Sequence, residues 1–141
     1  MDEMNEKILR AQLELDEGNR ARIYVDTVGK VSGGIGRNLT DRGFSADEID
    51  LMYANDIKLV LAELDKRWPW WRELNDPRQH VMINMCFNLG AGRLSGFKIF
   101  LADVQAKKWV QAAEDMLFSK WAEQVGRRAT RLAELMRTGE F

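Results

Sequence analysis

Glycine is concentrated in one short stretch of an otherwise helix-forming sequence, and this contrast limits the folds open to the chain. Gly29, Gly33, Gly34 and Gly36 fall close together. Glycines at this density mark tight turns between very short strands, and the residues just before them alternate in the manner of a strand. We therefore expect a small sheet of two or three strands within a mainly helical protein.

The rest of the chain carries apolar residues at helical spacing. We expect helices over residues 5–16, 45–66 and 76–89, and shorter ones around 97–106, 109–118 and 127–137. Ser45 and Glu48 form a capping-box pattern at the start of the second helix. Asp76 and Pro77 give an N-cap and first-turn signal for the third, whose residues are apolar on nearly all sides and predict a buried central helix. The long helix over 45–66 can connect two lobes with a cleft between them.

Composition excludes several classes of protein. The formal charge of -1 argues against a nucleic-acid binder, although residues 1–66 carry 14 acids and 9 bases, and residues 67–141 carry 8 acids and 12 bases. The acidic, amphipathic N-terminus does not resemble a signal peptide, and no apolar run is long enough to span a membrane. Cys86, the single cysteine, excludes an internal disulfide and is expected to be buried. With His80 as the single histidine, we expect no zinc site and no cofactor.

Two carboxylates and a hydroxyl flank the glycine-rich stretch. Glu17 is expected at a helix end, Asp26 at a strand end, and Ser32 in the next strand. Hydrolysis of a glycosidic bond needs two carboxyl groups, and a neighbouring hydroxyl can hold the attacking water. Among the 22 acidic residues of the chain, the spacing alone favours the alternative, a surface charge at Glu17 and a turn-forming aspartate at Asp26.

The same stretch resembles the active-site segment of phage-type lysozymes, the muramidases of glycoside hydrolase family 24. The family pattern is a glutamate before glycine, an aspartate nine residues later in a Y-x-D-x-x-G setting, and then T-x-G-x-G. This chain reads Glu17-Gly18, Tyr24 to Gly29, and Ser32 to Gly36. "INMCFNLG", "GF", "KKW", "SKWAEQ" and "RTGEF" resemble later family segments in the same order, so the resemblance covers essentially the whole chain.

The resemblance implies a mostly helical α+β fold, a two-lobed lysozyme. Residues 1–141 would form one domain, with a small sheet lobe over about 15–50, a linking helix over about 45–66, and a helical lobe over about 67–141 that includes the N-terminal helix. It also implies an N-acetylmuramidase, which cleaves the β-1,4 bond between N-acetylmuramic acid and N-acetylglucosamine with inversion. Glu17 would be the general acid, while Asp26 and Ser32 would hold the water.

This chain departs from the family pattern near the site. Ser32 stands where the family has threonine, which keeps the hydroxyl but loses restraint on its rotamer. Gly33 replaces a bulkier aliphatic residue, so a looser strand is expected. Arg37 replaces a histidine of the best-known member, a change expected to affect stability rather than catalysis.

Further roles are implied by position in the family. Arg128 would approach Glu17 and fix its geometry, with Arg131 near Asp16. Substrate-binding positions would be Asn38, Phe87, Phe100 and Asp115. Phe87 could equally be a plain core residue. The tryptophans of "WPWW" are interpreted as core at a helix junction rather than as a platform for sugars.

The implied partner is bacterial peptidoglycan, with no nucleic acid and no membrane segment. The protein would be a monomeric phage or prophage endolysin, made in the host cytoplasm and released through a holin or equivalent pore to act in the periplasm. Two alternatives remain open: a muramidase fold that binds peptidoglycan without cutting it, and a helical interaction protein with a chance motif.

Overall fold

Helices dominate the protein, and three short strands form its one sheet. The computed structural model describes all of residues 1–141 and confirms the predicted mostly helical α+β fold. The chain divides into two compact units, residues 1–51 and residues 52–141, with the boundary inside a helix. None of the helices is long and apolar enough to cross a bilayer. The two units are described separately.

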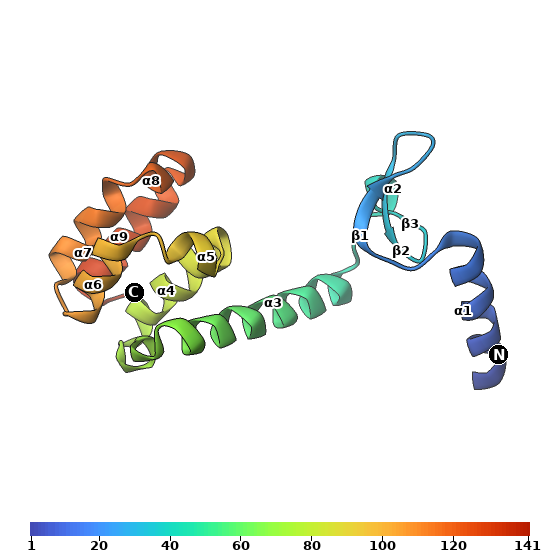
Figure 1. Cartoon of the computed structure of the whole chain (residues 1–141), viewed down its shortest axis with the longest axis horizontal. Helices are drawn as coiled ribbons and strands as arrows, with labels where there is room; N and C mark the ends of the chain where they lie inside the picture. The colour runs from blue at the N-terminus through green and yellow to red at the C-terminus, as the bar shows by residue number, and fades with distance from the viewer. The chain divides into compact units, whose positions relative to one another are not determined.

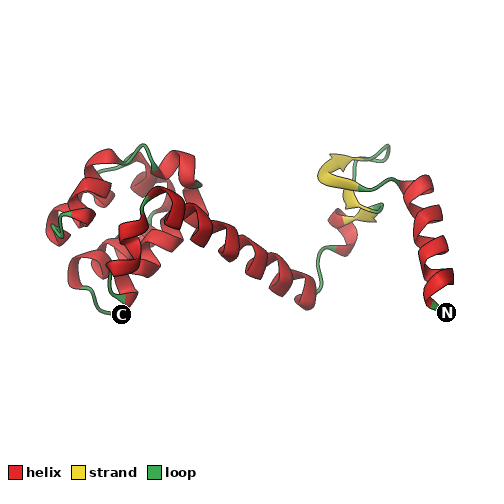
Figure 2. Cartoon of the chain, turned by 60° about the horizontal axis from the view of Figure 1, so that its bottom comes forward, coloured by secondary structure: helices red, strands yellow, loops and turns green.

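The first unit contains the sheet. Its elements are α1 (Glu3–Glu17), β1 (Arg20–Val25), β2 (Val31–Gly34), β3 (Arg37–Asn38), α2 (Leu39–Arg42) and the start of α3 (Ala46–Arg67). The strands lie in the order β1-β2-β3 and are antiparallel throughout; Figure 2 shows them in yellow. The Asp2 carboxylate caps α1 by accepting the Asn5 N–H at 2.8 Å, which places the start of this helix earlier than the sequence predicted.

Glycines have different roles within this sheet. Gly33 is buried in β2, and a Cβ there would lie 3.5 Å from Leu39 and 3.7 Å from Ile23, which is ordinary van der Waals contact. Gly34 has a φ of +59° at the end of the strand, a value that favours glycine. There is therefore unfilled space beside Gly33 that a methyl group fits, which makes the expectation of a looser strand at this position specific.

Gly33→Ala is expected to stabilise the sheet by about 0.5–1 kcal/mol, because alanine restricts the unfolded chain and its methyl group meets no clash. Chemical denaturation of the two proteins measures the difference. Gly34→Ala is the matched control, since the left-handed backbone should make that change destabilising. A loss of stability in Gly33→Ala would show that the sheet has no space for a methyl group at this position.

An ion pair joins the sheet to the start of α3. Arg37 pairs with Glu48, and its guanidinium also donates to the Gly43 carbonyl at 3.4 Å. The Glu48 carboxylate also accepts the Ser45 N–H at 2.8 Å. The Arg37 hydrogen bond is the main cause that lowers the pKa of Glu48 to about 2, with Ser45 contributing next.

This pair predicts loss of stability in acid. The pKa of Glu48 in the folded state is below its unfolded value of 4.5. The stabilisation of the fold by the Arg37–Glu48 pair is therefore fully present above pH 4.5 and is lost as pH falls through about 2. Arg37→Gln should raise amide exchange rates in β2 and β3 at pH 6, and the difference from wild type should narrow towards pH 2. Arg42→Gln, which removes an arginine without an ion pair, should show no such dependence. A difference that stays constant with pH would refute the proposed linkage.

The second unit is a helical bundle. After α3 it contains a 3-10 turn η1 (Pro69–Glu73) and the helices α4 (Asp76–Leu89), α5 (Ala91–Leu94), α6 (Lys98–Gln105), α7 (Trp109–Leu117), α8 (Lys120–Val125) and α9 (Arg127–Thr138). Figure 1 shows α6, α7 and α9 side by side. The side chains at the centre of the core are Leu64, Val81, Met82, Met85, Leu94, Val104, Met116 and Met136. Each such side chain contributes roughly 1.5–3 kcal/mol by its burial.

The tryptophans behave as the sequence predicted, whereas α4 is buried on one side only, since His80, Phe87 and Asn88 are exposed. α4 buries Val81, Met85 and Cys86, and burial raises the pKa of the Cys86 thiol. Trp71 is buried, and its indole N–H donates to Asp65 at 2.8 Å. Trp68 and Trp70 are partly buried and pack against the same core. The interpretation of "WPWW" as a junction core is confirmed.

Several local details differ from the predictions. Asn75, rather than Asp76, caps α4, because its side chain reaches the Arg78 N–H at 3.3 Å. Only the Glu48 half of the capping box forms, because the Glu48 carboxylate accepts the Ser45 N–H at 2.8 Å. The Ser45 hydroxyl donates to Glu48 at 2.6 Å instead of accepting a helix N–H. The short helices α2, α5 and α8 were not predicted, because four to six residues are too few to display a helical period.

Candidate active site

Glu17 is held at the junction of a helix and a turn. It is the last residue of α1, and Gly18 ends that helix with a φ of +85°. A Cβ at Gly36 would lie 2.7 Å from both Cβ and Oε2 of Glu17. Gly36 therefore lets the turn between β2 and β3 pass directly against the Glu17 side chain. The carboxylate itself is exposed in this structure.

Asp26 organises the turn that follows β1. One carboxylate oxygen, Oδ1, accepts the N–H groups of Val28 at 3.0 Å and Lys30 at 2.8 Å. The other oxygen, Oδ2, accepts the Ser32 hydroxyl at 3.5 Å. The turn-forming interpretation of this aspartate is thus correct, and it does not exclude a catalytic one, because only one of the two oxygens is needed to form the turn.

Ser32 is the buried polar residue of the sheet, with 4% of its surface exposed. It lies in β2 opposite Tyr24 of β1 and Asn38 of β3. This cross-strand position fixes the backbone of Ser32 while its hydroxyl points to Asp26. The first unit therefore brings Asp26 and Ser32 together, and the turn after Ser32 reaches Glu17 through Gly36.

Asn38 is already engaged by its neighbours. Its Oδ1 accepts the Asp41 N–H at 3.1 Å as the cap of α2, and its Nδ2 donates to the Asp41 carboxylate at 2.8 Å. Lys30 also contacts Asp41 at 3.1 Å. The predicted substrate-binding amide is therefore, in this structure, a helix cap.

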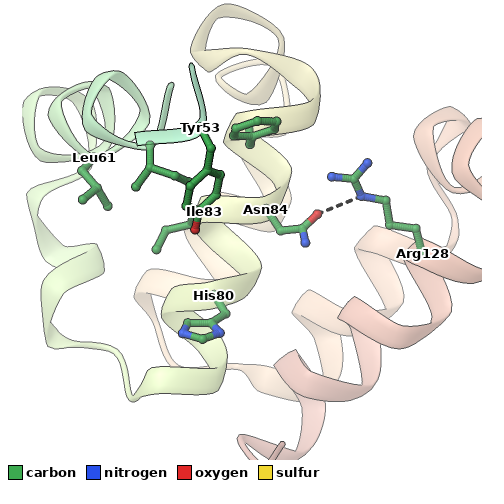
Figure 3. A pocket seen from close by; sticks show the side chains of 8 residues that line it. Tyr53, Leu61, His80, Ile83, Asn84 and Arg128 are labelled. Atoms are coloured by element: carbon green, nitrogen blue, oxygen red, sulfur yellow. Dashed lines mark hydrogen bonds between the residues drawn. The ribbon is translucent and has the colours of Figure 1, made fainter. Parts of the chain in front are cut away.

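Phe87 is the predicted binding residue that the helical unit presents most openly. It is 46% exposed on α4, so its ring is not a core residue. It lines a pocket of about 400 Å³ together with Tyr53, Ile57, Leu61, His80, Ile83, Asn84 and Arg128, most of which are labelled in Figure 3. An exposed ring beside a hollow of this size can receive an apolar face of a ligand.

Arg128 points into the same pocket. Its Nε donates to Asn84 Oδ1 at 2.8 Å, the dashed line in Figure 3. The guanidinium makes no other hydrogen bond within this unit, so its terminal nitrogens remain available as donors. Asn84 was missed by the sequence reasoning, because a single amide in an apolar helix segment gave no signal of its partner.

The two remaining predicted binding residues belong to the interior of the bundle. Phe100 is 2% exposed and packs edge-on against Phe97, with ring centroids 6.4 Å apart. Its ring stabilises the core, and its position in α6 gives a ligand no access to it. Asp115 on α7 is partly buried, and its Oδ2 has no hydrogen-bond partner.

Asp115 has an unusual electrostatic environment. Burial, followed by the neighbouring Asp103 carboxyl, raises the pKa of Asp115 to about 6. The ionised Asp115 carboxylate therefore destabilises the folded state. This destabilisation is absent below pH 3.8, the pKa of the carboxyl in the unfolded chain, and is fully present above about pH 6. At neutral pH the Asp115 carboxyl is therefore ionised, and no hydrogen-bond donor compensates its Oδ2 for the loss of water.

Asp115→Asn is expected to stabilise the bundle by about 1–2 kcal/mol at pH 8, because the buried charge is removed. The gain should disappear at pH 4, where the wild-type carboxyl is largely protonated. Urea unfolding at both pH values measures it, with the exposed, unpaired Glu123→Gln as control. An equal effect at the two pH values would show that charge is not the cause.

Comparison with known proteins identifies the family. Residues 14–138 match the family described as phage lysozyme. The chain belongs to the phage lysozyme family. It is therefore a glycoside hydrolase of the muramidase type, and the peptidoglycan of bacterial cell walls is its class of substrate.

Individual relatives within the phage lysozyme family are distant in sequence. Probable T4-type lysozymes 1 and 2 of Dictyostelium discoideum are each 24% identical to this chain, in alignments that cover 93% of it and 94% of the relative. The pre-baseplate central spike protein Gp5 of Enterobacteria phage T4 is 26% identical over 92% of this chain, but over only 27% of its own length. The phage lysozyme unit thus occurs in chains of very different length.

Proposed function

We propose that the protein is an N-acetylmuramidase that cleaves the β-1,4 bond between N-acetylmuramic acid and N-acetylglucosamine. The observation that carries this proposal is the hydrogen bond from the Ser32 hydroxyl to Asp26, within a sheet whose next turn passes against Glu17. Two carboxyl groups and a hydroxyl are the groups that glycoside hydrolysis requires. Membership of the phage lysozyme family supports the same chemistry.

In the proposed mechanism Glu17 protonates the glycosidic oxygen, and the bond between that oxygen and the anomeric carbon breaks. A water molecule, held by Asp26 and Ser32, loses its proton to Asp26 and attacks the anomeric carbon from the opposite face. The product has inverted configuration, and the carboxyl groups must be about 6.5–9.5 Å apart to admit the water. Asp26 suits this role because its Oδ2 contacts the Ser32 hydroxyl while Oδ1 fixes the turn.

We also propose that Arg128 supports Glu17 and that Phe87 contacts the sugar. The terminal nitrogens of Arg128 form no hydrogen bond within the helical unit, and Asn84 restrains their direction. NMR titration of the Glu17 carboxyl in wild type and in Arg128→Gln tests the contact between Arg128 and Glu17, and identical titration curves would exclude that contact.

Ile8, Leu9 and Leu13 leave an exposed apolar face on α1, which supports one domain in which α1 joins the helical lobe.

The biological role that we propose is host lysis by a phage or prophage. The protein would act as a monomer on the cell wall in the periplasm, after passage through a holin or an equivalent pore. The similarity to Gp5, a spike protein, favours one alternative, a lysozyme carried in a phage particle. Mass spectrometry of purified particles and of lysates distinguishes the two roles.

The decisive experiment is digestion of purified Gram-negative peptidoglycan, with the new ends identified. A muramidase leaves reducing N-acetylmuramic acid, which borohydride converts to muramicitol. Proton NMR of the first product then reports the anomeric configuration. Glucosamine at the new end would contradict the proposed bond, and a 1,6-anhydro product would assign a transglycosylase. Binding without any new ends would make the protein a module that only recognises the cell wall.

A further inference from the structure

A second pocket of the helical unit lies where η1, the end of α6 and the start of α7 meet. It has a volume of about 340 Å³, which is in the range of small-molecule sites. Two partly buried tryptophans, Trp70 and Trp109, form part of its wall. The other lining residues are Glu73, Leu74, Asn75, Val104, Gln105 and Lys107.

This tryptophan pocket is made by different residues from the pocket that Phe87 and Arg128 line. Asn75 caps the start of α4, whereas Phe87 lies in the last turn of that helix. The two residues are therefore about 18 Å apart along the helix axis. Glu17, Asp26 and Ser32, to which we assign the cleavage chemistry, do not line the tryptophan pocket either.

The indole rings of the tryptophan pocket are available to a ligand. The indole N–H groups of Trp71 and Trp121 donate to other side chains of the protein. Those of Trp70 and Trp109 have no partner in the protein and are not shut off from solvent. Trp70 packs against the core with part of its surface, and the rest lines the pocket.

The ring of Trp109 is held in place from outside the pocket. The Arg78 guanidinium lies over this ring, 3.9 Å from its centroid. Arg78 is itself fixed, because its Nε donates to the Met136 carbonyl at 2.8 Å. A ring that is already fixed loses little conformational freedom when a ligand packs on it.

Three polar side chains surround the indoles and have no partner in the protein. Glu73, Gln105 and Lys107 are exposed and form neither an ion pair nor a side-chain hydrogen bond. Glu73 and Lys107 carry opposite charges, so an anion would be repelled by one and a cation by the other. The pocket therefore suits a neutral ligand that both donates and accepts hydrogen bonds.

Lys107 reaches the rim of the pocket from an unusual backbone. Its φ of +61° makes it the one non-glycine residue of the chain with a positive φ, a conformation that is disfavoured for lysine. Hydrogen bonds hold the loop in this conformation, from the Lys107 N–H to Val104 at 3.0 Å and from the Lys108 N–H to Asp103 at 2.8 Å. Strained residues of this kind are concentrated at functional sites.

We propose that the tryptophan pocket binds a neutral pyranose sugar, at a site formed by none of the residues assigned to bond cleavage. One face of a pyranose ring presents C–H groups, which pack on an indole, while the indole N–H remains a donor. The hydroxyl groups around the ring then match Glu73, Gln105 and Lys107, and two of these contacts are strengthened by charge. The inference goes beyond hydrolysis and does not require it.

An NMR titration of the indole N–H signals tests the proposal. The probes are diacetylchitobiose and cellobiose, two neutral β-1,4-linked disaccharides with and without acetamido groups. Glu17→Gln is the background, so that neither probe is cleaved. The signals of Trp70 and Trp109 should shift in a saturable manner at millimolar saccharide, while those of Trp71 and Trp121 stay in place. Shifts with both probes would assign a general pyranose site, and shifts with diacetylchitobiose alone would assign a site for N-acetylated sugars.

A double variant tests the polar side chains without touching the core. Glu73→Ala with Gln105→Ala should weaken saccharide binding by about tenfold, as expected for the loss of two hydrogen bonds. The matched control is Glu123→Ala with Gln124→Ala, which removes the same two residue types from exposed, unpaired positions on α8. The control should bind as the background does.

Three results would overturn the proposal. The first is the absence of any shift at Trp70 and Trp109, including the case in which saccharide shifts only the amides around Phe87. The second is equal binding by the double variant and its control. The third is a shift of the Trp70 and Trp109 signals by free indole but by neither disaccharide, since the pocket would then take apolar aromatic molecules.

Discussion

Glu17→Gln is expected to lower the rate of peptidoglycan hydrolysis by about 10³-fold, because glutamine cannot donate a proton to the leaving oxygen and general acid catalysis is worth about 10²–10⁴ in rate. Affinity for the polymer should change little, since the amide keeps the size of the side chain. The measurement is the initial rate of reducing-end release, with sedimentation of sacculi reporting binding. The fold should persist, because Glu17 is exposed at the end of α1.

The control is Glu6→Gln on the same helix, an exposed carboxylate without an ion pair. It should retain the wild-type rate. Asp26→Asn should cost nearly as much as Glu17→Gln. Ser32→Thr, which keeps the hydroxyl and restores the rotamer restraint of the family's threonine, should retain activity. Substantial hydrolysis by Glu17→Gln would assign the acid to another group and overturn the proposed mechanism.

The sequence predicted those parts of the site that depend on local order. The end of α1, the end of β1 and the next strand follow from periodicity and glycine spacing, and these place Glu17, Asp26 and Ser32. The hydrogen bond from Ser32 to Asp26 then follows from strand register, because Ser32 lies opposite Tyr24, two residues before Asp26. The close approach of Gly36 to Glu17 could not be predicted, since a glycine required by φ and one required by contact look alike in sequence.

Three of the side chains carried over from the family as substrate-binding residues have other surroundings in this structure. Phe100 is a core residue because α6 turns that face inward, which a single aromatic letter does not reveal. Asn38 is a helix cap because four residues after it form α2, a helix too short to leave a periodic pattern. Asp115 owes its raised pKa first to burial and then to Asp103, a neighbour on a different helix. Each of these details depends on tertiary packing rather than on local sequence.

The second large effect is expected at Gly36, where one methyl group should disturb the general acid. Gly36 has a φ of +66°, and an added Cβ would lie 2.7 Å from Glu17 Oε2. Gly36→Ala should therefore cost about 1–2 kcal/mol of stability from backbone strain. It should also reduce hydrolysis by about 10²-fold at a temperature where the variant is folded, because displacement of a catalytic group by about 1 Å has a cost of this order.

Gly34→Ala separates the two causes. Gly34 lies in the same turn with a φ of +59°, but an added Cβ there meets nothing within 4 Å. Both variants should lose similar stability in thermal unfolding, while only Gly36→Ala should lose most of its rate of reducing-end release. Equal activity in the two variants would show that the position of Glu17 does not depend on this turn. A selective loss in Gly36→Ala would instead explain why the family pattern requires glycine at that position, since the sheet lobe would then hold the acid as well as Asp26 and Ser32.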